Sequence, residues 1–393
     1  MQYREDKYGN KISILGYGCM RFTKKGGAVD FEKAEAEILR GLSLGINYFD
    51  TAYIYPGNEE VLGRIIEKNG IRDKMKLATK LPQYIMKSEA AIEKTFNEEL
   101  KRLRTHRIDY YLMHMFTDAN EWEHLKSIGI LDFIKRHKAD GSIGQIGFSF
   151  HGDSDTFLKI LGLYDWDFCQ IQYNYLDEHS QAGRIGLETA YEKGIPVIIM
   201  EPLRGGRLVN TLPEGAMEVI KNDVSGYTAA EWGLRWLWNQ PGVTCVLSGM
   251  NSMEMIEENT RIASNARAGE FGEAENAVIS KIVEEIRKTE KVGCTGCRYC
   301  MPCPKGVDIP GNFHYYNMKA IEKKRKFGIE FVRNLALRKE PAFASQCIGC
   351  GKCEQHCPQK IKIREKLKEA DRALRPWWLR ILIPIIRFFY VKK

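Results

Sequence analysis

Short apolar runs alternate with amphipathic stretches over about the first two thirds of the chain. The apolar runs are residues 12–19, 48–52, 76–80, 109–114, 143–150, 168–173, 196–200 and 244–250. Between them, apolar residues recur at helical spacing in residues 31–44, 88–103, 121–137, 181–193 and 229–238. Eight strands, each followed by a helix, predict an α/β fold of the TIM (β/α)8 barrel type. An open doubly wound sheet is the alternative, but Gly16-Tyr17-Gly18 lacks the glycine fingerprint of that fold.

Eight of the eleven cysteines form two tight groups after the alternation ends. The groups are Cys294, Cys297, Cys300, Cys303 and Cys347, Cys350, Cys353, Cys357, each followed by proline. The second group has the C-x2-C-x2-C-x3-C-P spacing of bacterial ferredoxins with two clusters, and it predicts two [4Fe–4S] clusters. Zinc sites usually pair two C-x2-C units across a longer gap, and disulfides need an oxidising compartment, so both fit less well. The lone cysteines, Cys19, Cys169 and Cys245, lie in apolar segments and are expected to be buried.

In two-cluster ferredoxins, the fourth cysteine of each group ligates the other cluster. The resemblance assigns Cys294, Cys297, Cys300 and Cys357 to one cluster and Cys347, Cys350, Cys353 and Cys303 to the other. The first group departs from the pattern, because only two residues precede its fourth cysteine.

These patterns divide the chain into four predicted parts. Residues 1–265 form the barrel, and residues 266–291 form a connector helix. Residues 292–371 form a small ferredoxin-like iron–sulfur domain with a helical basic insert. Residues 372–393 form a hydrophobic and basic amphipathic tail.

The tail at residues 376–391 is apolar, with basic residues at its ends and middle. It is shorter than the roughly 20 residues that a membrane span needs, and Pro384 interrupts it. Packing against the rest of the chain, lying on a membrane surface as a peripheral helix and dimerisation all remain open.

The net charge of +8 is concentrated after residue 315, for example in Lys323-Lys324-Arg325-Lys326. A basic run is ordinarily a solvated helix face, and its functional interpretations are an acidic redox partner or an anionic membrane. Nucleic acid is not expected, because no binding motif accompanies the charge. Eleven cysteines and a polar N-terminus without a secretory signal predict a reducing cytoplasm. The clusters indicate an anaerobic organism.

Four polar residues fall where catalytic groups of a TIM barrel lie, at the C-terminal ends of strands. These are Asp50, Tyr55 in the following loop, Lys80 and His114. A phenol is a weak acid at neutral pH, and a nearby ammonium favours its ionised form. A carboxylate keeps that ammonium charged, and a histidine can orient a carbonyl oxygen. The set therefore suits acid-assisted reduction of a carbonyl group.

Residues 1–265 resemble an aldo/keto reductase. The resemblance rests on Asp50-Thr51-Ala52 with Tyr55, Ala78-Thr79-Lys80, Asp109 through His114, Ile146-Gly147-Phe148-Ser149, Gln170, Pro202-Leu203 and Glu258-Asn259. It implies NAD(P)H-dependent carbonyl reduction in a TIM barrel, with the tetrad Asp50, Tyr55, Lys80 and His114, and with Tyr53 as a lesser candidate for the acid. It also implies cofactor contacts at Ser149, Gln170, Pro202, Leu203, Gly205, Gly249, Asn251, Glu258 and Asn259.

The chain departs from that family at three places. Phe150 replaces the asparagine of the Gly-x-Ser-Asn motif, where His151 is a substitute. Met255 stands where an arginine often binds the 2′-phosphate of NADP, so the choice between NADP and NAD stays open, with Arg204 and Arg261 as compensating candidates. The cysteine groups stand in place of the C-terminal substrate loop, as in a branch of the family with a ferredoxin-type domain.

The combined interpretation is an NAD(P)H-dependent oxidoreductase that reduces an aldehyde or ketone. Its clusters serve electron relay, redox sensing or structure, and relay implies a ferredoxin-like redox partner. Passing single electrons to nicotinamide directly is unfavourable without a mediator, and a barrel can bind flavin without a linear motif. The alternative is a dinucleotide-binding, partner-binding protein with little carbonyl turnover, as in the potassium-channel beta subunits of the same family.

Overall fold

The computed structural model describes residues 1–393 except 295, 297–299, 323–329, 339, 358 and 391–393. The chain forms two compact units. The first contains residues 1–208 and 227–275, and the second contains residues 209–226 and 276–393.

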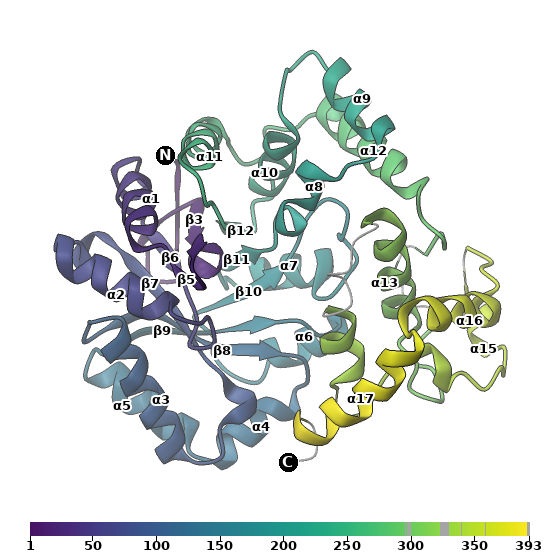
Figure 1. Cartoon of the computed structure of the whole chain (residues 1–393), viewed down its shortest axis with the longest axis horizontal. Coiled ribbons are helices and arrows are strands. Elements are labelled where there is room, and N and C mark those ends of the chain that lie inside the picture. Colours follow the sequence, from purple (N-terminus) through teal and green to yellow (C-terminus); the bar gives the residue numbers. More distant parts are fainter. Residues whose placement is uncertain (295, 297–299, 323–329, 339, 358, 391–393) are drawn as a thin grey trace. The chain divides into compact units, whose positions relative to one another are not determined.

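Eight parallel strands of the first unit close into a barrel, surrounded by helices (Figure 1). The strands are β3 (Leu15–Gly18), β6 (Tyr48–Asp50), β7 (Lys76–Leu81), β8 (Ile108–Phe116), β9 (Ile143–Phe150), β10 (Phe168–Gln172), β11 (Val197–Met200) and β12 (Val243–Ser248). They follow one another in chain order around the barrel, and β12 pairs with β3 to close it. The predicted TIM barrel is therefore confirmed.

Ten helices belong to the barrel, and several of them begin at a side chain that caps a free N–H group. They are α1 (Phe31–Ser43), α2 (Asn58–Asn69), α3 (Glu89–Arg102), α4 (Asn120–Ser127), α5 (Ile130–Ala139), α6 (Ser154–Leu161), α7 (Gly183–Glu192), α8 (Arg207–Asn210), α10 (Ala229–Asn239) and α11 (Met253–Asn265). Asp30, Ser88 and Asp153 cap α1, α3 and α6. The single helix expected over residues 121–137 is two helices, because Gly129 has a φ of 96° and ends the first.

Alternating strand residues fill the barrel with an aromatic layer. Tyr48, Tyr110 and Phe168 point inward, and the Tyr110 ring centroid lies 5.1 Å from that of Tyr48 and 5.2 Å from that of Phe168. Side chains two positions further along a strand lie on the same face. The next inward positions are Asp50 on β6, Lys80 on β7, His114 on β8 and Gln170 on β10. The packed layer is therefore the floor of the polar end of the barrel.

Two hairpins precede or interrupt this arrangement. β1 (Tyr3–Glu5) pairs with β2 (Lys11–Ser13), so the first predicted run divides into β2 and β3. Asp6 lies between β1 and β2 and accepts a 2.6 Å hydrogen bond from the Tyr110 hydroxyl at the N-terminal end of the barrel. β4 (Lys24–Lys25) and β5 (Ala28–Val29) are joined by Gly26-Gly27, both with positive φ, as a two-residue hairpin turn requires.

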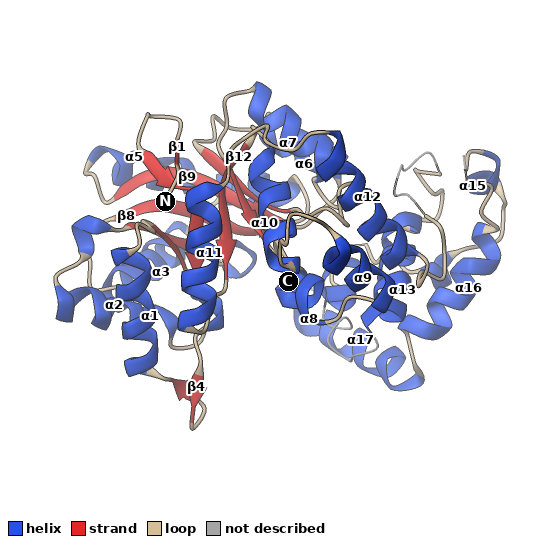
Figure 2. Ribbon diagram, turned by 90° about the horizontal axis from the view of Figure 1, so that it is seen from above, coloured by secondary structure: helices blue, strands red, loops and turns tan. Residues whose placement is uncertain are grey.

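The described part of the second unit contains helices and loops and no strand (Figure 2). Its helices are α9 (Glu214–Asn222), α12 (Glu273–Arg287), α13 (Ile309–Glu322), α15 (Lys352–Gln355), α16 (Ile363–Leu374), α17 (Trp377–Tyr390) and the π-helical turn Val332–Ala336. Among the described residues of both units, short 3-10 turns are Cys19–Arg21, Arg72–Lys74, Gln83–Ile85, Arg204–Gly206 and Ala344–Gln346.

Two apolar clusters hold the second unit together, one along the N-terminal parts of α13 and α16 and one along their C-terminal parts. One contains Phe313, Ile363 and Leu367 and has most of the described cluster cysteines packed against it. The other contains Phe331, Leu374 and the inward residues of α17. Among the described residues, no helix has both the length and the apolar character to cross a bilayer.

Candidate active site

Asp50, Lys80 and His114 lie at the C-terminal ends of three neighbouring strands and are all buried. Lys80 Nζ donates to both carboxylate oxygens of Asp50, each at 2.6 Å, and to the carbonyl oxygen of Thr51 at 2.7 Å. Burial raises the pKa of Asp50, and the charge and hydrogen bonds of Lys80 oppose that rise. A charged pair of this kind persists in the interior because each partner offsets the desolvation of the other.

Tyr55 lies in the loop after β6 and faces two of these residues. Its ring centroid is 5.6 Å from Lys80 Nζ and 6.2 Å from the ring centroid of His114, with the rings edge to face at 83°. The loop is held by the Tyr55 N–H, which donates to Ala52, and by Asn58, whose N–H donates to the Tyr55 carbonyl. The phenol is therefore placed between an ammonium and an imidazole.

Tyr53 has a different environment, although it lies only two residues earlier. The guanidinium carbon of Arg102 lies 4.3 Å from its ring centroid, and Arg102 also donates to the Tyr53 carbonyl oxygen. Tyr53 is thus packed under a helix α3 side chain. Tyr53 therefore contacts Arg102, whereas Tyr55 lies near Lys80 and His114.

Buried carboxyl groups of α2 and α3 form a hydrogen-bonded network with β7 and β8, next to the loop after β6. The sequence alone does not identify this network. The Thr79 hydroxyl donates to Glu59 at 2.6 Å, and the Tyr111 hydroxyl donates to Glu99 at 2.7 Å. Arg102 pairs with Glu59 at 3.3 Å. Burial raises the pKa of Glu59 to about 7, and burial together with the Glu59 charge raises that of Glu99. In the sequence both glutamates look like ordinary charges of amphipathic helices.

Ser149 and Gln170, which the resemblance assigns to the nicotinamide amide, are register partners on β9 and β10. The Ser149 hydroxyl accepts a 2.8 Å hydrogen bond from the Met115 N–H. Gln170 is buried, and its Oε1 atom has no hydrogen-bond partner among the described residues. A buried amide oxygen without a partner is costly, so this position fits a ligand that carries an N–H donor. His151 lies with Nδ1 3.2 Å from Gln181 Oε1.

The loops after β11 and β12 carry the remaining assigned cofactor residues. Pro202 and Leu203 follow β11, and Gly249 and Asn251 follow β12. A Cβ atom added at Gly205 would lie 2.6 Å from Arg21 Nη2, and one added at Gly249 would lie 2.5 Å from Arg21 Cδ. Arg21 therefore joins these two loops and adds a cation that sequence reasoning missed. Its one sequence signal is its place just after the first barrel strand.

Helix α11 holds Glu258 and Asn259, and both already have partners in the first unit. Asn259 donates to the Ser248 hydroxyl at 3.1 Å, and Glu258 accepts from the Thr228 hydroxyl at 3.0 Å. The position of Met255 on the same helix is 44% exposed.

Neither arginine proposed to replace a 2′-phosphate contact is free of carboxylates. Arg204 is buried and makes a two-point pair with Asp177 at 2.7 and 2.9 Å. Arg261 is more exposed and donates to Glu231 at 2.8 Å.

In the second unit, a cavity of about 190 Å³ is lined by thiols of both cysteine groups. Its wall includes Cys303 together with Cys347, Cys350 and Cys353, and also Cys300. Cys294 and Cys357 pack with Cys300 against the neighbouring apolar cluster. Cys297 lies outside the described residues. The ten described cysteines form no disulfide.

No three described His, Cys, Asp or Glu side chains converge closely enough to hold a single metal ion. A four-iron cubane is larger than one ion, so its thiolates stand further apart. The described cavity lining has five cysteines and one histidine, His356, and a donor set dominated by thiols suits iron–sulfur chemistry.

Two buried asparagines of α13 hold the chain ahead of the cysteine groups. Asn317 accepts from the N–H groups of Lys291 and Val292, just before Cys294. Asn312 donates to the Ala342 carbonyl oxygen and accepts from the Ala344 N–H, shortly before Cys347. One helix therefore sets the approach of both cysteine loops, and nothing in the cysteine spacing signals these amides.

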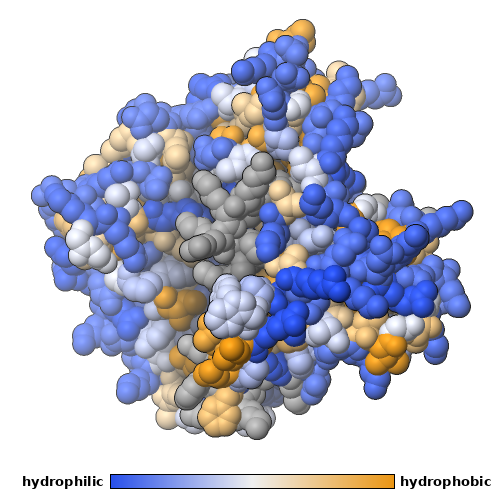
Figure 3. Space-filling view, turned by 45° about the vertical axis from the view of Figure 1, so that its right-hand side comes forward, coloured by the Kyte–Doolittle hydropathy of each residue, from blue (hydrophilic) through white to orange (hydrophobic). Residues whose placement is uncertain are grey.

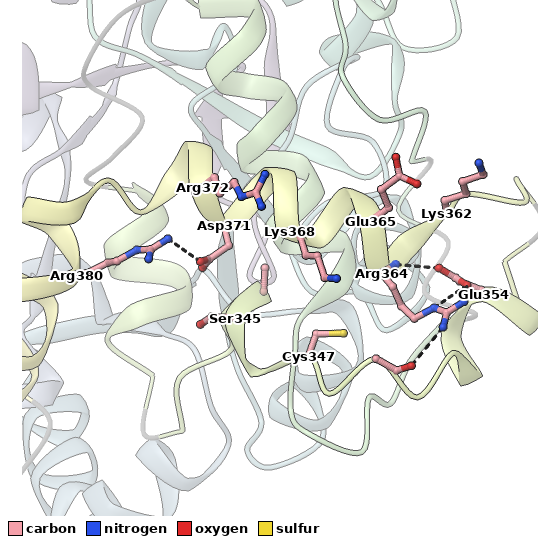
Figure 4. A pocket seen from close by; sticks show the side chains of 12 residues that line it. Ser345, Cys347, Glu354, Lys362, Arg364, Glu365, Lys368, Asp371, Arg372 and Arg380 are labelled. Carbon is pink, nitrogen blue, oxygen red and sulfur yellow. Dashed lines mark hydrogen bonds and ion pairs between the residues drawn. The ribbon is translucent and has the colours of Figure 1, made fainter.

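A basic groove of about 950 Å³ lies along α16, with Cys347 on its wall (Figure 4). Arg364, Lys368 and Arg372 line it at intervals of one helical turn and are exposed. Arg364 pairs with Glu354 at 2.8 Å. The groove brings these cations and the Cys347 thiol to one surface.

Comparison with known proteins finds two matches to family models. The model of the aldo/keto reductase family matches residues 14–270, and that of the 4Fe-4S dicluster domain matches residues 293–361. The uncharacterized oxidoreductase YqkF of Bacillus subtilis (strain 168) is 26% identical over 320 residues, covering 71% of this chain and 96% of that protein.

Solved structures give the same result for the barrel. The holo form of aldo-keto reductase AKR11C1 from Bacillus halodurans matches with a TM-score of 0.60 and 26% identity, covering 72% of this chain and 96% of that one. An aldo/keto reductase from Klebsiella pneumoniae, in complex with NADP and acetate, matches in fold with a TM-score of 0.59 and 23% identity, covering 71% of this chain and 94% of that one.

The raised pKa of Glu59 predicts a pH dependence of stability. The folded state binds this proton more tightly than the unfolded state, so stability falls as pH rises from about 4.5 to about 7 and then levels off. As pH rises from 5 to 8, the free energy of unfolding of Glu59→Gln minus that of the parent is expected to increase by on the order of 1–2 kcal/mol. Urea unfolding, followed by barrel tryptophan fluorescence, measures it.

Glu32→Gln on α1 is the control, because Glu32 is exposed. The difference in free energy of unfolding between Glu32→Gln and the parent should not change with pH. If the difference between Glu59→Gln and the parent is also constant, the raised pKa of Glu59 is contradicted.

Proposed function

Because the chain belongs to the aldo/keto reductase family, we propose that this oxidoreductase reduces a small aldehyde or ketone with NADPH or NADH. The observation that carries the proposal is the position of Tyr55, whose ring lies near both Lys80 Nζ and the His114 ring. An ammonium beside a phenol favours the phenolate, which makes the phenol a better acid.

The proposed proton path uses the chain's own residues. His114 orients the carbonyl oxygen of the substrate, and the Tyr55 hydroxyl gives that oxygen its proton. The carboxylate of Asp50 keeps Lys80 charged through two 2.6 Å hydrogen bonds. A bound reduced nicotinamide supplies the hydride that the carbonyl carbon receives. One proton and one hydride together convert the carbonyl to an alcohol.

Ser149 and Gln170 are proposed to hold the nicotinamide amide, and the unpartnered Gln170 Oε1 supports this. Pro202, Leu203, Gly205, Gly249 and Asn251 are proposed to follow the phosphates, with Glu258 and Asn259 at the adenine. The exposed guanidinium of Arg21 between Gly205 and Gly249 adds a charge suited to a pyrophosphate. NADP in the related Klebsiella pneumoniae structure supports the same cofactor class.

Two four-iron clusters are proposed in the second unit. The cavity wall of Cys303, Cys347, Cys350 and Cys353 supports the crossed assignment of one cluster. Cys294, Cys297, Cys300 and Cys357 are proposed for the other. Such clusters supply one-electron transfer.

A second candidate function is electron exchange with an acidic, ferredoxin-like protein. The basic groove supports it, because exposed Lys368 and Arg372 share a surface with Cys347. Opposite charge on a partner raises the rate of encounter at low salt.

Tyr55→Phe is expected to lower carbonyl reduction by about 10²- to 10⁴-fold, because the proton donor is removed. Dinucleotide binding, followed by quenching of protein fluorescence, should stay within about threefold of the parent. The control is Tyr53→Phe, which should stay active. Activity of Tyr55→Phe within a few-fold of the parent would contradict the role.

A parent protein that binds dinucleotide but turns over no carbonyl in a broad panel of aldehydes, ketones and quinones would instead favour the dinucleotide-binding, partner-binding alternative.

Anaerobically purified protein is expected to contain about eight irons per chain. Cys303→Ser and Cys357→Ser should each lower this to about four, and electron paramagnetic resonance should show that they remove different clusters. Cys169→Ala is the control, because Cys169 is buried in the barrel. Retention of all iron in both variants would refute the assignment of Cys303 and Cys357 as cluster ligands.

Charge reversal tests the electron-exchange candidate. Lys368→Glu with Arg372→Glu is expected to slow cluster reduction by an acidic [2Fe–2S] ferredoxin about tenfold at low salt, and less at high salt. Lys281→Glu with Arg287→Glu, both exposed on α12, makes the same charge change elsewhere. Equal slowing in both pairs would mean that the groove is not the docking site.

A further inference from the structure

Helix α17 presents an apolar stripe to solvent. Its members are Trp377, Trp378, Ile381, Leu382, Ile385 and Phe388, which are between 43% and 75% exposed. Successive residues of an α-helix are about 100° apart, so the six lie within an arc of about 140°. The stripe is about 17 Å long at 1.5 Å per residue.

The opposite side of α17 anchors it in the second unit. Leu379 and Ile383 are buried and pack in one cluster with Phe331, Leu335 and Leu374. The stripe is therefore exposed even though the opposite face of α17 is packed against the second unit. Figure 3 shows apolar side chains gathered on the surface, bordered by hydrophilic ones. An exposed apolar surface of this kind ordinarily marks an interaction site.

The charge around the stripe indicates what covers it. Residues 276–393 contain 26 Lys and Arg against 11 Asp and Glu, a net charge of +15, whereas residues 1–275 contain 33 against 40. From residue 372 onward, the sequence has six basic residues and no acidic one. Arg380 and Arg387 lie on the flank of α17, about 60–80° from the edge of the stripe. Arg380 is exposed and pairs with Asp371 at 3.2 Å, whereas Arg387 donates to the carbonyl oxygens of Ala336 and Arg338. An anionic lipid bilayer can accommodate both the stripe and the basic charge, because its acyl chains bind the apolar groups and its headgroups attract the basic ones.

A second copy of the chain fits less well, because pairing two stripes would bring two regions of +15 together. Crossing a membrane does not fit either, because α17 is 14 residues long and contains Pro384.

We propose that α17 docks the protein on an anionic lipid bilayer, lying in the plane of its surface. The stripe enters the boundary between headgroups and acyl chains, and the net positive charge of residues 276–393 attracts the lipid phosphates. Trp377 and Trp378 suit the headgroup level, because their rings are apolar with one polar atom. Apolar insertion and basic attraction together supply the two contributions that stable peripheral binding needs.

The test is flotation of the anaerobically purified full chain with phosphatidylcholine vesicles, with and without phosphatidylglycerol. We expect binding only to the anionic vesicles, weakened by high salt. Ile381→Glu with Ile385→Glu should lower it at least about tenfold, because both residues belong to the stripe and neither is an anchor. Leu131→Glu with Ile185→Glu adds the same charge at exposed apolar positions of the barrel and is the control.

Failure to float with anionic vesicles would overturn the proposal, as would equal binding by the stripe variant. Sedimentation showing a parent dimer that the stripe variant dissociates, without vesicle binding, would assign the stripe to a second copy instead. Capture of a soluble protein by the stripe without vesicle binding would also overturn it. Flotation is independent of carbonyl turnover, so it fails or succeeds separately from the proposed reaction.

Discussion

The buried pair of Lys80 and Asp50 is the interaction on which the candidate site depends. An ammonium in the barrel interior is costly unless carboxylate and carbonyl oxygens satisfy its donors. Here two oxygens of Asp50 and one of Thr51 do so, at 2.6 to 2.7 Å. Lys80 therefore stays charged at a position 5.6 Å from the ring centroid of Tyr55. Strand geometry supplies this placement, because β6 and β7 are neighbours whose ends lie at one rim of the barrel.

The chemistry proposed for the two units involves different numbers of electrons, and the net charges of the two parts of the chain also differ. Hydride transfer moves two electrons together, whereas a [4Fe–4S] cluster moves one. The charge asymmetry between residues 1–275 and 276–393 concentrates basic groups on the cysteine-containing part. The groove along α16 and the stripe on α17 both belong to that part. The proposed contacts with anionic partners therefore belong to the second unit, and the residues proposed for carbonyl chemistry belong to the first.

Much of the barrel was predictable, because its strands are short apolar runs and side chains alternate along them. That period places Asp50, Lys80 and His114 on one face, and the family pattern adds Tyr55. The supporting groups were harder to predict. Glu59 and Glu99 lie at helical spacing on the apolar faces of α2 and α3, but this spacing does not identify their partners, and Arg21 carries no periodic signal. Their roles arise when distant segments pack. Gly129 shows the same limit, since a helical pattern can continue across a glycine that ends the helix.

The pH profile of kcat/KM for carbonyl reduction in the parent and in Lys80→Met measures the coupling between Lys80 and Tyr55 most directly. Parent activity is expected to fall on the alkaline side as the phenol of Tyr55 loses its proton. In Lys80→Met the plateau should be lower and that alkaline limb should move to higher pH, because the neighbouring cation is gone. An alkaline limb at the same pH in both proteins would contradict the coupling between Lys80 and Tyr55.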